Sequence, residues 1–152
     1  MPKPGRIFLS HSAKDRSLVE RLARLLDDHK LRYFYSRRHI LGAQQWHDEI
    51  GKALARCDWF VLVLSPDAVA SKWVKHELLF ALEDRAYEGH IVVLDYHRAR
   101  YKKLSWTLHS VQWVDFRHGF DGGCRELLRV WNKEYRPVQG KGKQTPGSKK
   151  AG

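Results

Sequence analysis

Cysteine is scarce in this sequence of 152 residues. The two cysteines, Cys57 and Cys124, lie far apart, and neither belongs to a Cys-x-x-Cys pair. This usage argues against a disulfide framework and against a cysteine-based zinc module, and it fits the reducing environment of the cytoplasm. We expect both thiols to behave as small hydrophobic residues of the core.

Long hydrophobic runs are also missing. No apolar run approaches the roughly 20 residues that a membrane-spanning helix needs. The first residues, MPKPGRIFLSHS, contain an apolar stretch that is too short for a secretory signal. We therefore expect a cytoplasmic protein that does not enter a membrane.

The motifs of several enzyme classes are absent. The chain has no G-x-x-x-x-G-K-S/T loop and no G-x-G-x-x-G, so neither a P-loop ATPase nor a Rossmann dehydrogenase is supported. The G-x-S-x-G elbow of serine hydrolases is missing as well. The nine histidines show no metal-ligand spacing such as H-E-x-x-H, and we therefore expect no metal site.

Acidic residues are relatively few: the sequence has 17 aspartates and glutamates against 28 lysines and arginines, which gives a net charge of +11. The segment 136–152 holds five of these cations and no acid, and it is rich in Gly, Pro, Lys and Ser. This composition predicts a disordered basic tail or linker after a single domain of residues 1–135. The rest of the chain is mildly basic and suits an anionic ligand as well as DNA. Nucleic-acid binding is therefore a weaker alternative, and we expect the tail to account for most of it.

Apolar runs of strand length alternate with segments of helical periodicity. The strand-length runs are residues 6–10, 31–35, 59–64, 91–96 and 111–115. The third run, WFVLVL, is apolar throughout, as is typical of a strand buried on both faces of a parallel sheet. The alternation predicts an α/β fold in three layers, a five-stranded parallel sheet with helices on both faces.

The expected helices have recognisable ends. The sequence SAKD, Ser12 to Asp15, resembles a capping box and predicts the start of the first helix. The last helix is expected from about Asp121 to Tyr135, with Leu127, Leu128 and Trp131 on its inner side.

One helix carries an acid in an unusual place. In SKWVKHELLFAL, Ser71 to Leu82, the apolar face is formed by Ala70, Val74, Leu78, Ala81 and Leu82. Glu77 does not lie with the charged residues of the opposite side. It falls four residues after Trp73, along the border of the apolar face. The pattern therefore places a carboxylate beside a tryptophan at the edge of the core.

Several stretches in this order resemble the Toll/interleukin-receptor (TIR) domains of the bacterial type. They are FLSHSAKD, HILGAQQW, CDWFVLVLSPDAVASKWVKHEL and the last strand–helix pair, and together they cover about residues 6–131. The resemblance implies a flavodoxin-like fold. It also implies one of two functions, because some TIR domains are signalling adaptors and others, in immune-type signalling and bacterial defence, cleave NAD⁺ to nicotinamide and ADP-ribose or a cyclic isomer.

In the enzymes of this family the essential acid is the Glu of a W-x-x-x-E pattern, which here is Trp73 to Glu77. The resemblance therefore implies that Glu77 is catalytic. Cleavage of the nicotinamide–ribose bond builds positive charge on the ribose, which a nearby carboxylate stabilises. Trp73 would supply an apolar wall for the substrate. NAD⁺ is then a substrate, and no cofactor is expected.

The resemblance also implies substrate contacts from two loops. The loop after the first strand supplies Ser10, His11 and Ser12, and the BB loop after the second strand supplies Arg37, Arg38, Ile40, Leu41 and Gly42. The two arginines, with Lys14, suit the pyrophosphate of NAD⁺. Many relatives carry an acidic residue just after the second strand, where this chain has Tyr35-Ser36-Arg37-Arg38.

Two other interpretations remain open. The chain can be a non-catalytic interaction module that self-associates with other TIR domains and binds partners through the BB loop. Glu77 can be an ordinary solvated acid paired with Lys72 or Arg85. If the chain is an enzyme, the family implies that assembly with a neighbouring TIR domain completes its site.

Overall fold

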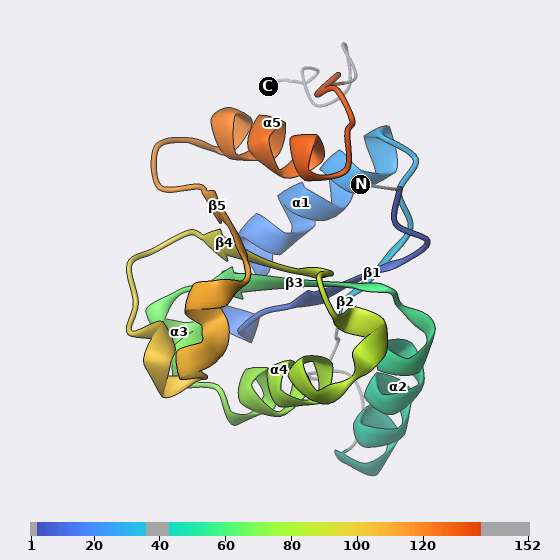
Figure 1. The fold of residues 1–152 in the computed structure, drawn as a ribbon, viewed down its shortest axis with the longest axis vertical. Helices are drawn as coiled ribbons and strands as arrows, with labels where there is room; N and C mark the ends of the chain where they lie inside the picture. Colours follow the sequence, from blue (N-terminus) through green and yellow to red (C-terminus); the bar gives the residue numbers. More distant parts are fainter. Residues whose placement is uncertain (1–2, 36–42, 138–152) are drawn as a thin grey trace, which may run out of the picture.

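The computed structural model describes residues 3–35 and 43–137, and these form a twisted parallel sheet between two layers of helices (Figure 1). The sheet has five strands in the order β2-β1-β3-β4-β5. Their bounds are β1 Ile7–Ser10, β2 Tyr33–Tyr35, β3 Trp59–Leu64, β4 Ile91–Asp95 and β5 Gln112–Asp115. All four strand pairs are parallel, so the predicted α/β architecture is confirmed.

The helices cover both faces of the sheet. In Figure 1, α1 (Arg16–Asp28) and α5 (Phe120–Val130) lie on one face, and α2 (Ala43–Arg56) and α4 (Lys72–Glu83) lie on the other. A short helix, α3 (Pro66–Val69), follows β3. The described residues also include four short 3₁₀ segments: η1 Ala13–Asp15, η2 Arg85–Tyr87, η3 Tyr101–Lys103 and η4 Trp106–Ser110. None of the described helices is long and apolar enough to cross a membrane.

The core has two halves because β3 is covered on both sides. Every residue of β3 is buried. Val61 and Val63 pack with the helices of one face, whereas Phe60 and Leu62 pack with those of the other. The alternation follows from the pleat of the strand, which points successive side chains to opposite faces. Cys57 and Cys124 are both buried, as predicted.

Two helix boundaries differ from the prediction. Ser12 caps the 3₁₀ turn η1 through a hydrogen bond from the Lys14 N–H, so the α-helix itself begins later, at Arg16. The last helix ends at Val130 instead of Tyr135. The chain turns at Asn132, whose φ of 57° lies in the left-handed region. Of the predicted tail, residues 138–152 lie outside the described part of the chain.

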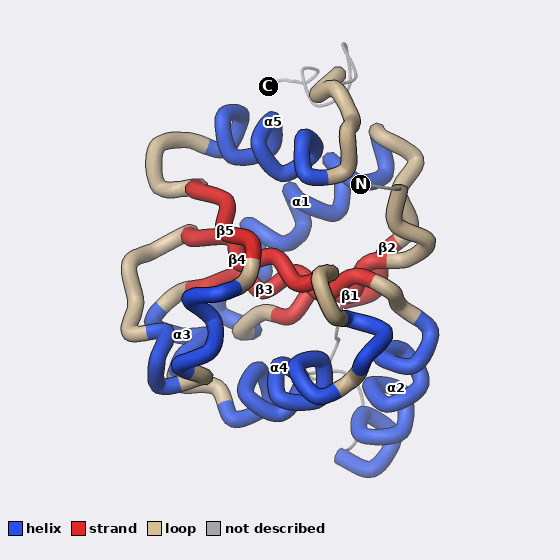
Figure 2. The backbone as a smooth tube through the Cα atoms, in the orientation of Figure 1, coloured by secondary structure: helices blue, strands red, loops and turns tan. Residues whose placement is uncertain are grey.

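The connection from β4 to β5 contains no α-helix. It leaves β4, runs past α3 and returns through the turns η3 and η4 (Figure 2). Because this connection starts at the end of β4, its first residues lie at the carboxyl end of the sheet, where ligands of parallel α/β folds bind.

Candidate functional site

Glu77 lies inside the domain, at the end of the first strand. Its side chain is 2% exposed. The hydroxyl of Ser10, the last residue of β1, donates a hydrogen bond of 2.7 Å to Glu77 Oε1. Ser10 is itself buried. The interpretation of Glu77 as a solvated surface acid is therefore wrong.

The position of Glu77 follows from the way in which α4 begins and packs. Ser71 caps the helix by accepting a hydrogen bond from the Val74 N–H. Val74, Leu78 and Ala81 are then buried against the sheet. Glu77 precedes Leu78 and shares this inner side, which brings its carboxyl over the end of β1.

Trp73 stands one helical turn before Glu77 and is half buried. It packs at the rim of the hydrophobic cluster below α4. The Lys72 ammonium lies 4.9 Å from the centre of the indole ring, and the His76 ring meets it edge-on at 5.9 Å. Trp73 thus contacts the core on one side and cationic or polar groups on the other.

The other predicted residues of the first loop lie beside Ser10. His11 is buried, and its ring meets the ring of Tyr35, at the end of β2, at a centroid distance of 5.9 Å. Ser12 is also buried and caps η1. The structure therefore brings Ser10, His11, Ser12 and Glu77 to the carboxyl ends of β1 and β2.

Comparison with known proteins identifies the family. A model of the TIR domain matches residues 7–128. The chain belongs to the TIR family. A search of curated proteins finds no match. Among solved structures, the TIR domain of the Toll-related receptor TRR-2 from Hydra magnipapillata is similar, with a TM-score of 0.65 and 16% identity over 84% of this chain and 98% of the other.

Two further structures share the fold. The TIR domains of the activated Roq1 resistosome, which directly recognises the pathogen effector XopQ, align with a TM-score of 0.62 and 17% identity over 82% of this chain and 97% of the other. A prokaryotic SEFIR domain aligns with a TM-score of 0.61 and 13% identity over 90% and 99%. TIR domains include NAD⁺-cleaving and non-catalytic signalling members, and they self-associate.

The remaining predicted site residues of this TIR domain lie outside the described part of the chain. They are Arg37, Arg38, Ile40, Leu41 and Gly42 of the BB loop. The loop begins after Tyr35 and ends where α2 starts at Ala43. Both of these ends are described, and Tyr35 is in contact with His11.

A second buried polar pair of the TIR domain escaped the sequence analysis. Ser65, directly after β3, donates a hydrogen bond of 2.5 Å to Asp15 Oδ2 and accepts one from the Ala68 N–H. Burial raises the pKa of Asp15, although the Ser65 hydrogen bond opposes this shift. The signal in the sequence was a serine directly after an apolar strand, but its partner lies 50 residues away. Within residues 3–35 and 43–137, no cluster of His, Cys, Asp or Glu is arranged to hold a metal.

Proposed function

We propose that this TIR domain is an NAD⁺ nucleosidase that acts in immune-type signalling and uses Glu77 as its catalytic carboxylate. The observation that supports the proposal is the place of Glu77: a buried carboxyl at the carboxyl end of the sheet, oriented by Ser10. A carboxylate held in a low-dielectric site interacts strongly with a developing positive charge.

The reaction requires little from the protein besides this charge. The bond between ribose C1′ and the nicotinamide nitrogen breaks, and its electron pair stays on nicotinamide, which leaves as a neutral molecule. Glu77 stabilises the positive ribose. Water then adds to C1′ and releases a proton to give ADP-ribose, or a nucleophile of the same molecule closes a ring. The Ser10 hydroxyl keeps the Glu77 carboxylate in a single orientation throughout.

The burial of Glu77 bears on how the enzyme is activated. A side chain that is 2% exposed meets the ribose only after its surroundings open. We infer that association with a second TIR domain supplies this opening, so that the isolated domain turns over slowly. Specific activity is then expected to rise with protein concentration.

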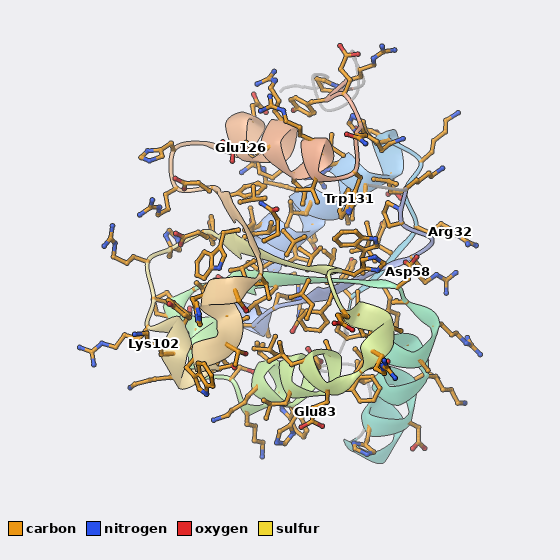
Figure 3. All side chains as sticks on the ribbon, viewed as in Figure 1. Arg32, Asp58, Glu83, Lys102, Glu126 and Trp131 are labelled. Carbon is orange, nitrogen blue, oxygen red and sulfur yellow. The ribbon has the colours of Figure 1, made fainter. Side chains whose placement is uncertain are left out.

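NAD⁺ consumption by the concentrated protein, followed by chromatography of the products, tests the proposal. Glu77→Gln keeps the shape and an acceptor for Ser10 but removes the charge, and we expect it to abolish release of nicotinamide. Glu83→Gln is the matched control, because Glu83 is on the same helix but points away from the sheet (Figure 3). Equal activity of wild type and Glu77→Gln contradicts the proposal.

The hydrogen bond between Ser10 and Glu77 is also compatible with the alternative function, a non-catalytic TIR interaction module. In that case Glu77 has a structural role only and stabilises the packing of α4 on β1. No nicotinamide is then released at any protein concentration, even from forced dimers. Glu77→Gln would in addition leave self-association unchanged in analytical ultracentrifugation.

A further inference from the structure

A cavity of about 530 Å³ lies between α3 and the loop that follows β4. Helix α3 and the residue after it contribute Pro66, Val69 and Ala70, and the loop contributes Arg98, Ala99, Arg100 and Lys103. One wall is therefore hydrocarbon, and the other carries three cationic side chains. The volume is in the range of pockets that hold small molecules, about 300–1,000 Å³.

The positive charge of this cavity is not neutralised by the protein. Within residues 3–35 and 43–137, Arg98, Arg100 and Lys103 form no ion pair. The nearby carboxylates have other partners, because Asp67 lies 3.9 Å from Lys14 and Asp95 lies 3.4 Å from Arg117. The sequence from residue 96 to residue 114 contains no Asp or Glu. The cavity therefore attracts anions.

The loop that carries these cations is fixed to the domain. The N–H groups of Tyr96 and His97 both donate to the Leu64 carbonyl, at 3.3 and 3.2 Å. Further along, the Lys75 ammonium donates to the Lys103 carbonyl at 3.4 Å, and Leu104 is buried. A fixed backbone lowers the entropy that the cationic side chains lose when they bind a ligand.

We propose that this cavity is a binding site for a nucleotide, separate from Glu77 and independent of the proposed NAD⁺ cleavage. The phosphates contact Arg98, Arg100 and Lys103, since guanidinium groups bind phosphate oxygens in pairs and an ammonium adds a third charge. The base lies against Val69, Ala70 and Ala99. The hydroxyl groups of a sugar phosphate would meet only hydrocarbon side chains on the α3 wall, whereas the flat face of a base loses little hydration there.

Isothermal titration of the full chain with ADP at about 0.15 M salt, where the Debye length is about 8 Å, tests this site. We expect saturable binding of one ADP, and an affinity lower by at least about tenfold in the double variant Arg98→Glu, Arg100→Glu, because each charged hydrogen bond contributes about a factor of ten. Adenosine, which has no phosphate, should bind at least about tenfold more weakly than ADP.

Two variants are the controls. Lys102→Glu reverses a charge in the same loop, but Lys102 does not line the cavity and points into solvent (Figure 3). It should leave the affinity for ADP within about threefold, because exposed charges are screened. Glu77→Gln should leave the affinity unchanged, which separates this cavity from the proposed catalytic site. Arg98, Arg100 and Lys102 are all exposed, so we expect their variants to fold. Circular dichroism spectra that match that of the wild type would verify this.

Five results overturn the proposal. Four concern the site: the absence of ADP binding up to millimolar concentration, an affinity that the double variant does not change, an equal loss in Lys102→Glu, and loss of binding in Glu77→Gln. The fourth result would place ADP at Glu77 and leave the proposed NAD⁺ cleavage intact. Inorganic pyrophosphate that binds as tightly as ADP would show that the hydrocarbon wall contributes nothing, and it would overturn the assignment to a nucleotide.

Discussion

Replacing Ser10 by alanine removes the hydroxyl that donates to Glu77 and leaves the rest of β1 in place. Both side chains are buried, and the bond between Ser10 Oγ and Glu77 Oε1 is 2.7 Å long. Leaving a buried polar group without its hydrogen-bond partner costs about 1–3 kcal/mol. We expect Ser10→Ala to lower the free energy of unfolding by about 2 kcal/mol. In a domain of this size that corresponds to about 4–8 °C in Tm.

Urea unfolding followed by tryptophan fluorescence measures this loss, since Trp59 and Trp131 are buried and report on the core. Ser17→Ala is the control, because Ser17 is exposed on α1 and its replacement should change the free energy by less than about 0.5 kcal/mol. Glu77→Gln should cost less than Ser10→Ala, since the amide still accepts from Ser10. The loss of unfolding free energy in the double variant should differ by about 1 kcal/mol from the sum of the losses in the two single variants. A Ser10→Ala loss within the range of the control, or strictly additive losses, would refute the stabilising role of this hydrogen bond.

Three other predictions follow from buried groups. Burial raises the pKa of Asp15 above 3.8, so the contribution of this carboxyl to stability is complete at lower pH and is lost as the pH rises through the raised pKa. Asp15→Asn does not titrate, and it should therefore gain stability relative to wild type between pH 4 and pH 7. Urea unfolding of both proteins at pH 4 and at pH 7 measures this difference. In α5, a Cβ on Gly123 would lie 2.5 Å from the Phe116 ring whereas one on Gly122 meets nothing within 4 Å, so thermal melts should show a loss of about 1–3 kcal/mol for Gly123→Ala and a gain of about 0.5–1 kcal/mol for Gly122→Ala. Burial raises the pKa of Cys57 and of Cys124 to about 12, so both thiols should stay unmodified by a disulfide reagent at pH 8 until denaturant is added; modification of the folded protein would contradict their burial.

The sequence predicted the middle of the sheet well because β1, β3 and β4 are covered on both faces. The run WFVLVL is apolar at every position, which predicts a strand buried on both faces, and every residue of β3 is indeed buried. The end of α5 was harder. Leu127, Leu128, Trp131 and Tyr135 continue a helical spacing, but Tyr135 reaches its partly buried position without a helix. After the turn at Asn132, its ring stacks on His29 at a centroid distance of 5.9 Å.

The site was predicted only as far as local periodicity reaches. The helical pattern placed Glu77 at the border of the apolar face, and the structure buries it fully because Ser10 supplies a hydrogen-bond donor from 67 residues away. The pair of Asp15 and Ser65 was missed for the same reason. Such contacts depend on the strand order, which sets β1 beside β3 and cannot be derived from the spacing of residues within one segment.

The place of β1 between β2 and β3 also bears on the order in which the sheet can form during synthesis. During synthesis, β1 emerges first, but of its two neighbours only the three-residue β2 follows soon after. Its long partner β3 and the helix that carries Glu77 come later, so Phe8, whose ring stacks on Phe60 of β3, lacks this cover until then. Parallel pairings of this kind close large loops before they gain contacts, which makes them slow to form. The nascent chain therefore leaves part of β1 uncovered until β3 has been made, and this exposed apolar surface is prone to aggregation.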